Sequence, residues 1–174
     1  MTTRHLAVTS PLGPIVLAAD DQGLVGVWFE GQQHFPEWAD LGEATDLDDS
    51  LLATAERQLD EYFAGDRTSF DLPLHRRGTD LQMQVWERLD TIPYGRTTTY
   101  GAIAAALGDP NLAQAVGGAV GHNPLSIVVP CHRVVGANGS LTGYAGGLDR
   151  KTALLRLEGI LQGEPQTLFE MARG

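Results

Sequence analysis

The sequence contains almost none of the features that mark secreted, metal-binding or membrane proteins. Cys131 is the only cysteine among 174 residues, which excludes an internal disulfide framework and any zinc site built from clustered cysteines. The first residues form no apolar signal core, and no hydrophobic run is long enough to span a bilayer. We therefore expect a cytoplasmic protein with a free thiol, no membrane partner and no metal.

Positive charge is also scarce. The chain has 12 Lys and Arg against 22 Asp and Glu, a net charge of −10, which argues against a polyanionic partner such as nucleic acid. The imbalance is uneven, because residues 1–78 carry 14 acidic and 5 basic side chains, whereas residues 79–163 carry 6 of each. Any contact with a polyanion is therefore expected on the C-terminal part, and solubility alone explains the acidic N-terminal part.

The length fits one domain or two small ones, and the pattern favours two. Residues 1–78 predict a meander of three strands, over 4–9, 14–19 and 24–30, and then an amphipathic helix over 51–64. His75-Arg76-Arg77-Gly78 reads as a linker, so we place a boundary after residue 78. A second domain then covers 79–163 and a tail covers 164–174. The first domain shows no constellation of residues that carries chemistry.

The second domain begins with a predicted capping box at Thr79 and Gln82, which starts a helix that runs to about Ile92. Two short helices, over 100–107 and 111–121, are separated by Gly108-Asp109-Pro110, a pattern typical of a helix-turn-helix. The second of them is rich in alanine and glycine, and interior glycine costs up to about 1 kcal/mol relative to alanine. Close approach of DNA and close packing of another helix both explain those glycines.

Cys131 follows the apolar run Ile127–Val129, which predicts a buried strand that Pro130 ends, leaving the thiol at its tip. His132 and Arg133 come next, and positive neighbours favour the thiolate that a nucleophile requires. A buried structural cysteine is the alternative, because adjacent side chains on a strand point to opposite faces. Glu158 lies near the C-terminal end of the last predicted helix, where the dipole disfavours an anion, and a histidine partner would explain it.

These motifs together resemble the O6-alkylguanine-DNA alkyltransferases. The resemblance rests on Pro130-Cys131-His132-Arg133, on Asn123-Pro124 before it, and on Tyr144-Ala145-Gly146-Gly147 and Leu154–Gly159 after it. It implies an α+β fold, with a small N-terminal ribonuclease H-like α/β domain followed by a mainly helical winged-helix domain that carries the active-site cysteine. It also implies direct-reversal DNA repair by irreversible, stoichiometric transfer of a methyl or other alkyl group from O6 of guanine to the protein's own cysteine. Whether O4 of thymine also serves is left open.

The resemblance further implies which residues carry the chemistry, with no cofactor. Cys131 would be the nucleophile, and His132 would draw its proton through a water. Glu158 would hold the imidazole and stabilise its charged form, as the third member of a triad does. Asn123 would brace the site by hydrogen bonding. The thioether product is stable, so each molecule should react once.

The partner that the resemblance implies is double-stranded DNA carrying O6-alkylguanine, bound through the minor groove by a protein that is monomeric off DNA. The damaged nucleotide must leave the base stack, at a cost of a few kcal/mol. Tyr100 would rotate the phosphate and hydrogen-bond the flipped base. Small residues on the recognition helix would allow the groove to approach closely, and these are Ala113, Gly117 and Gly118.

Four further residues would hold the extrahelical base or the DNA next to it. Tyr144 would wall the pocket, and the Ala145 N–H would donate to guanine O6. Val134 would line the pocket and offer its carbonyl to the guanine amine. Arg133 is grouped with these substrate and DNA contacts because of its charge.

One residue departs from the family's pattern. The recognition helix carries Gln114 where the family usually has an arginine that fills the gap left by the flipped base. An amide can hydrogen-bond an orphaned base but brings no charge to the phosphates. We therefore expect less ready base flipping, or another side chain in that role. The zinc found in some relatives is not expected, because the cysteines for it are missing.

Three other functions are weighed against this one. A Cys-His-Glu hydrolase would turn over repeatedly, but no oxyanion-hole motif is evident and a helix-turn-helix has no use in it. A lesion-binding protein without alkyl transfer would lack the cysteine. A transcription regulator would place base-reading polar side chains on the recognition helix, which offers mainly Asn111 and Gln114.

Overall fold

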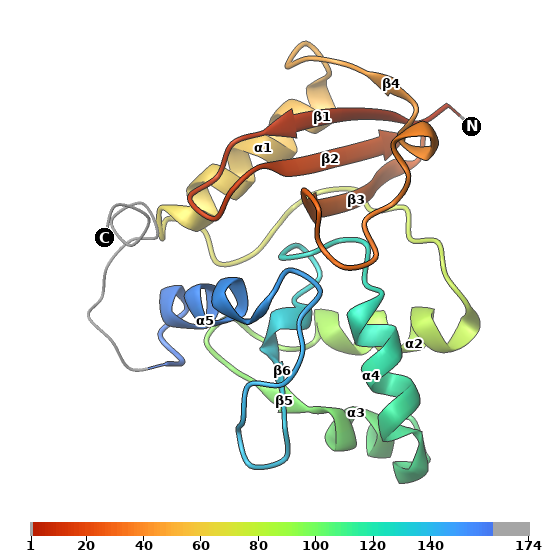
Figure 1. The fold of residues 1–174 in the computed structure, drawn as a ribbon, viewed down its shortest axis with the longest axis vertical. Coiled ribbons are helices and arrows are strands. Elements are labelled where there is room, and N and C mark those ends of the chain that lie inside the picture. Colours follow the sequence, from red (N-terminus) through yellow and green to blue (C-terminus); the bar gives the residue numbers. More distant parts are fainter. Residues whose placement is uncertain (1, 162–174) are drawn as a thin grey trace.

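The N-terminal part of the chain is a small sheet with one helix against it. In the computed structural model, which describes residues 2–161, the sheet order is β3-β2-β1-β4. β1–β2 and β2–β3 pair antiparallel, and β1–β4 pair parallel. The elements are β1 Arg4–Val8, β2 Ile15–Asp20, β3 Gly23–Phe29, β4 Glu43–Ala44 and the helix α1 Ser50–Phe63. The predicted meander and helix are confirmed, and Figure 1 shows α1 lying along the sheet.

Burial on both faces of this sheet explains its sequence. Every residue of β2 is buried, which is why its apolar run is continuous rather than alternating. One face packs against the apolar stripe of α1, formed by Leu52, Ala55, Leu59, Tyr62 and Phe63. The other face carries the smaller cluster Val16, Ala18, Trp28 and Leu41. Asp49 caps α1 by accepting a hydrogen bond from the Leu52 N–H at 3.0 Å.

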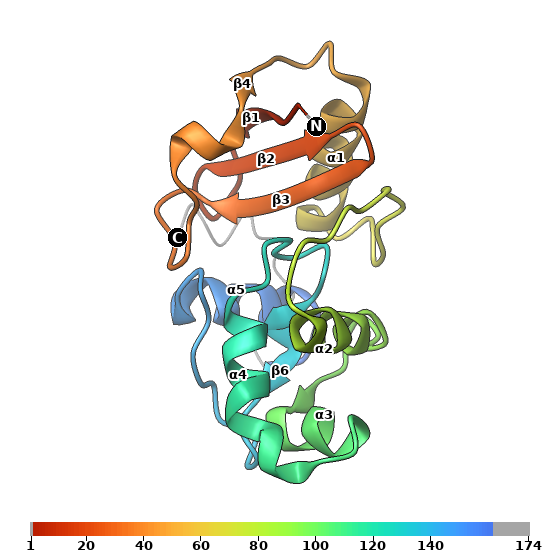
Figure 2. The same cartoon turned by 90° about the vertical axis from the view of Figure 1, so that its right-hand side faces the viewer.

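The C-terminal part is mainly helical and stands below the sheet in Figures 1 and 2. The predicted capping box is present at the start of the first helix, where Thr79 and Gln82 cap each other's backbone. A two-stranded parallel sheet, β5 with β6, lies beside the helices. The elements are α2 Asp80–Asp90, β5 Thr98–Thr99, α3 Tyr100–Ala106, α4 Ala113–Gly121, β6 Val134–Val135 and α5 Leu148–Leu157. None of the helices in residues 2–161 is long and apolar enough to cross a membrane.

The predicted pair of short helices is α3 and α4, with one difference at the turn. Residues Pro110–Leu112 form a short 3₁₀ helix, η2, so α4 begins at Ala113 rather than at Asn111. Asp109 caps η2 by accepting from the Asn111 N–H at 2.9 Å. Proline suits the first position of such a turn because its φ is already helical and no N–H is needed there, and a 3₁₀ turn is a common start for an α-helix.

The predicted strand over Ile127–Val129 is wrong. These residues form a turn, in which the Val129 N–H donates to the Leu125 carbonyl at 2.8 Å and Ile127 has φ 71°. The segment is buried because it lies where the two parts of the chain pack together, not because it belongs to a sheet. The Val27 N–H of β3 donates to the Pro124 carbonyl at 2.8 Å, and the Ser126 N–H donates to the Val27 carbonyl at 3.0 Å. A left-handed β-branched residue marks a strained turn just before the cysteine.

The linker between the two parts is tied to the sheet through Asp20. Its buried carboxylate accepts hydrogen bonds from His75 at 2.6 Å and from Arg77, and also from the Gln22 N–H at 2.8 Å. Burial alone would raise the pKa of Asp20, but these bonds outweigh it and lower the pKa to about 2. The carboxylate is therefore charged at neutral pH and holds the linker in place.

An Asp20→Asn variant should lose roughly 1–3 kcal/mol of stability at pH 7, because the linker loses its anionic partner. The pKa is depressed in the folded state, so the stabilisation is present above the unfolded value near 3.8 and is lost as pH falls from about 4 to about 2. Urea unfolding of both proteins at several pH values measures this. An unchanged gap between them at pH 7 and pH 3 would contradict it.

Candidate active site around Cys131

A buried carboxylate holds the histidine beside the cysteine. Cys131–Arg133 form the 3₁₀ turn η3, and Glu158 is the C-cap residue of α5. The His132 Nε2–H donates to Glu158 Oε2 at 2.6 Å, and both side chains are fully buried. The contact expected between His132 and the helix-end carboxylate of Glu158 is therefore present.

His132 is oriented to accept a proton at its other nitrogen. With Nε2–H turned to the carboxylate, Nδ1 is left as the acceptor. Nδ1 is buried and has no hydrogen-bond partner among the described residues. Burial lowers the pKa of His132 below its usual value, although Glu158 opposes this shift. The imidazole is thus a neutral base whose free lone pair is shielded from bulk water.

The expectation that Arg133 favours the thiolate of Cys131 is wrong. Burial raises the pKa of the Cys131 thiol above its usual value, against the opposing effects of a hydrogen bond with Asn123 and the charge of Lys151. Arg133 directs its charge elsewhere, since its Nε donates to Glu158 Oε1 at 2.7 Å. The thiol is therefore protonated at rest and needs a base before it can react.

Arg133 also does not reach a DNA-binding surface. Its side chain is buried, and Nη1 donates to the Ile92 carbonyl at 2.7 Å. Nη2 adds a contact to Glu158 Oε2 at 3.2 Å. We correct the assignment of Arg133 as a DNA contact, because a guanidinium committed to a buried carboxylate and a carbonyl has no charge to offer a phosphate. Its place is beside Glu158, which it fixes.

Asn123 braces the turn that precedes the cysteine. Its side-chain Nδ2 donates to the Val129 carbonyl at 2.9 Å, and its Oδ1 accepts from the Leu125 N–H at 3.0 Å. Both bonds are buried. They join the backbone on both sides of Ile127, so Asn123 holds the turn that leads into Cys131 in one conformation.

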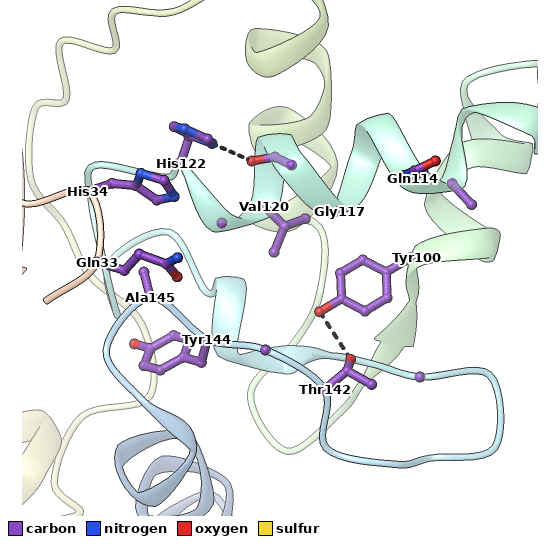
Figure 3. A pocket seen from close by; sticks show the side chains of 15 residues that line it. Gln33, His34, Tyr100, Gln114, Gly117, Val120, His122, Thr142, Tyr144 and Ala145 are labelled. Carbon is purple, nitrogen blue, oxygen red and sulfur yellow. Dashed lines mark hydrogen bonds between the residues drawn. The ribbon is translucent and has the colours of Figure 1, made fainter.

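A cavity of about 600 Å³ lies beside this centre. Figure 3 shows it between α4, Tyr100 of α3 and the loop that carries Thr142 to Ala145. The Thr142 hydroxyl donates to the Tyr100 hydroxyl at 3.3 Å across this space. Seven of the residues singled out in the sequence line the cavity, and they are Tyr100, Ala113, Gln114, Gly117, Gly118, Tyr144 and Ala145.

Cys131 and Val134 are not among the cavity's lining residues. Cys131 is 4% exposed, and the Val134 carbonyl accepts a hydrogen bond from Lys151 Nζ at 2.6 Å. Tyr144 links the two places, because it lines the cavity and because burial and, after it, the nearby Cys131 raise the pKa of its hydroxyl.

Several residues at the site carried no signal in the sequence. Lys151 is completely buried and also donates to the Thr142 carbonyl at 2.9 Å. Burial lowers the pKa of Lys151 to about 8. From the N-terminal part, the Gln33 N–H donates to the Ala145 carbonyl at 3.0 Å, and His34 stacks on His122 at 3.8 Å between ring centroids (Figure 3). The spacing of Lys151 from Leu154 and Leu155 is the one signal that could have placed it on the buried face of α5, and nothing local marks Gln33 and His34.

Within residues 2–161, no group of three or more His, Cys, Asp or Glu side chains could hold a metal ion. The described centre itself offers a buried thiol, a neutral imidazole and a carboxylate. Such a set can remove the proton from the thiol when an electrophile arrives, and can hold that proton as imidazolium.

Comparison with known proteins matches both parts of the chain to domains of one protein family. Residues 80–160 match "6-O-methylguanine DNA methyltransferase, DNA binding domain", and residues 4–75 match "6-O-methylguanine DNA methyltransferase, ribonuclease-like domain". The "Methylated-DNA--protein-cysteine methyltransferase" of Mycobacterium tuberculosis is 46% identical over 169 residues, covering 95% of this chain and 98% of that protein. The protein of the same name from Methanosarcina acetivorans is 49% identical over 151 residues, covering 86% and 94%.

Solved structures agree with these relatives. The structure titled "Crystal structure of Mycobacterium tuberculosis OGT in complex with DNA" superposes with a TM-score of 0.81 at 44% identity, covering 95% of this chain and 99% of that one. A methyltransferase structure from Methanococcus jannaschii superposes with a TM-score of 0.55 at 28% identity, covering 85% and 95%. Both domains of the α+β fold expected from the sequence are thereby confirmed.

Lys151 gives a test of the electrostatics that needs no DNA. A Lys151→Met variant removes the positive charge that opposes the raised pKa of the Cys131 thiol, so that pKa should rise further. The pH dependence of Cys131 alkylation by iodoacetamide measures this pKa. Arg156→Met removes an exposed charge from the same helix and should leave the midpoint unchanged. Equal midpoints for the wild type and Lys151→Met would contradict this reading of Lys151.

Proposed function

Because the chain belongs to the 6-O-methylguanine DNA methyltransferase family, whose members move an alkyl group from damaged DNA onto themselves, we propose that Cys131 is the acceptor. The protein is a direct-reversal DNA-repair methyltransferase, like its relatives named methylated-DNA–protein-cysteine methyltransferase. One observation supports the sulfur of Cys131 as the acceptor atom. A protein-cysteine acceptor must be a cysteine, and this chain has only one.

We propose the following route for the proton and the alkyl group. Cys131 gives its proton, through a bridging water, to His132 Nδ1, and Glu158 stabilises the imidazolium that forms. The sulfur attacks the alkyl carbon, the bond from that carbon to guanine O6 breaks, and the departing guanine takes up a proton. A thioether has no easy way back, so one protein molecule repairs one lesion. His132 Nδ1, buried and without a protein partner, supports its role as the receiving atom.

The cavity supports binding of an extrahelical O6-alkylguanine. Its volume falls within the range of small-ligand sites, about 300–1,000 Å³. We propose that the base enters past Tyr100, packs on Tyr144 and accepts a hydrogen bond at O6 from the Ala145 N–H. The Gln33 N–H donates to the Ala145 carbonyl and so holds this residue from the N-terminal domain. The Val134 carbonyl already accepts from Lys151, so its contact to the guanine amine would use its second lone pair.

The glycines of α4 support the minor groove as the DNA surface. A side chain at Gly118 would meet nothing within 4 Å, and one at Gly117 would only touch the Tyr100 ring at 3.8 Å. Packing inside the protein therefore does not require glycine at these positions, which leaves close approach of a partner as the explanation. With Ala113 and Gln114 they line the cavity mouth. We propose that this face enters the minor groove, where shape matters more than sequence.

We propose that the protein acts as a monomer off DNA, because every residue in the proposed transfer can be supplied by a single chain. The competing hydrolase makes a different prediction about turnover. Single-turnover transfer consumes one protein per lesion, whereas a thioester-forming hydrolase would release its product and continue.

Titration of a duplex containing O6-methylguanine against the protein tests the proposal. The amount of lesion removed should equal the amount of protein and should not grow with time. Cys131→Ser should remove none, because a serine hydroxyl is far less nucleophilic than a thiolate. Continued removal beyond one equivalent, or full activity of Cys131→Ser, would disprove the assignment.

Gln114 offers a second test, aimed at base flipping. Gln114→Arg should speed repair of the lesion in duplex DNA by about tenfold, since an arginine can fill the gap and also meet the phosphates. Reaction with free O6-benzylguanine should stay unchanged. The control is Ala115→Arg, which adds the same charge to an exposed neighbour outside the cavity lining. Equal gains from both variants would show that charge, not the gap, limits the rate.

A further inference from the structure

Tyr62 connects the N-terminal part of the chain to the reactive centre. It lies in the last turn of α1 and is fully buried, 96 residues before Glu158. Its hydroxyl donates to Glu158 Oε2 at 2.6 Å. This is the same oxygen that His132 Nε2 contacts at 2.6 Å. The carboxylate oxygen that holds the catalytic imidazole is therefore shared with a tyrosine from the other domain.

We propose that Tyr62 is a positioning residue for alkyl transfer, which by sharing Glu158 Oε2 limits how strongly the carboxylate holds a proton on His132. The inference rests on the proposed function, in which His132 must be neutral to receive the proton of Cys131. A carboxylate with all its charge directed at the imidazole would favour imidazolium before the reaction begins. A second donor on the same oxygen takes up part of that charge.

The surroundings leave Tyr62 as the one neutral hydroxyl donor to this carboxylate among the described residues. Glu158 also faces Arg133 of η3, at 2.7 Å to Oε1, and the Gly95 N–H at 3.4 Å. The further titratable or charged groups that face the histidine–glutamate pair are Lys151 of α5, Cys131 of η3, Tyr94 after α2 and Tyr144 before α5.

Tyr62 remains a donor at every pH at which the protein works. Burial and the neighbouring carboxylate raise the pKa of Tyr62 well above its usual value. Hydrogen bonds from His132 and Arg133 outweigh the effect of burial and lower the pKa of Glu158 to about 2. The pair is therefore a phenol donating to a permanent anion, and its effect on His132 does not switch off near neutral pH.

The arrangement gives the first domain a part in the chemistry that its sequence does not show. The ring of Tyr62 packs against Phe63 and Phe70 of its own domain and against Tyr94 of the other. These contacts hold the hydroxyl in place over the carboxylate. Separation of the domains would leave Glu158 with one donor fewer and His132 with a higher pKa.

The test compares Tyr62→Phe with Tyr94→Phe in the full-length protein. Tyr94 is a matched control, because its hydroxyl donates to the Leu157 carbonyl at 3.3 Å and not to Glu158. In Tyr62→Phe the pKa of His132, followed by NMR titration, should rise by about one unit. The acid limb of the pH–rate profile for alkyl transfer should move up by the same amount. The His132 resonance is identified by its loss in His132→Gln.

A second substitution keeps the test valid if Tyr62→Phe does not fold. Replacement of Tyr62 by 3-fluorotyrosine preserves the shape and strengthens the donor, so the pKa of His132 should fall and the acid limb should move to lower pH. Tyr94→Phe should leave the pKa of His132 unchanged. An unchanged pKa of His132 in the folded variants of Tyr62, or shifts of the opposite sign there, would overturn the proposal and leave Tyr62 as a packing residue. Loss of thermal stability alone does not support it.

The outcome separates this inference from the proposed function. If the wild type is not methylated by the damaged duplex, the proposed function fails, and the NMR titration still decides the role of Tyr62. If the wild type is methylated with one equivalent and the titration does not respond to position 62, only the role of Tyr62 fails.

Discussion

The buried carboxylate of Glu158 is the interaction on which the rest of the site depends. It accepts hydrogen bonds from His132 and Arg133 of η3 and from Tyr62 of α1, two stretches of the chain that lie far apart in sequence. A buried anion is tolerated only when it is paired and hydrogen-bonded, and loss of one partner from such a pair costs about 3–5 kcal/mol. The same group therefore orients the base, neutralises a buried arginine and joins the two domains.

Burial also decides how the thiol is activated. A cysteine at an exposed, electropositive position would be a thiolate at rest and would react with many electrophiles. Here burial raises the pKa of Cys131, and the neutral imidazole of His132 stands ready to receive the proton. The sulfur becomes a nucleophile only when a substrate is held in place. A protein that reacts once benefits from this restraint, because every wasted reaction consumes a molecule.

The sequence was sufficient for the features that local physics controls. The three N-terminal runs read as strands, the capping box at Thr79 and the turn around Asp109 predicted elements that the structure contains. It failed where distant contacts decide. Burial made Ile127–Val129 look like a strand, but a turn held by Asn123 and Val27 satisfies its backbone. Arg133 looked like an activating or DNA-binding charge because Glu158, its partner, lies 25 residues away. No local pattern predicts the partners of Tyr62 and Lys151.

The central claim is that burial keeps His132 neutral at rest, while Glu158 holds its proton on Nε2 and leaves Nδ1 free to accept from Cys131. The ¹⁵N chemical shifts of the His132 ring at neutral pH test this most directly. The account predicts a protonated Nε2 and an unprotonated Nδ1 in the wild type, and loss of that preference in Glu158→Gln. A proton on Nδ1, or a doubly protonated ring at rest, would contradict it.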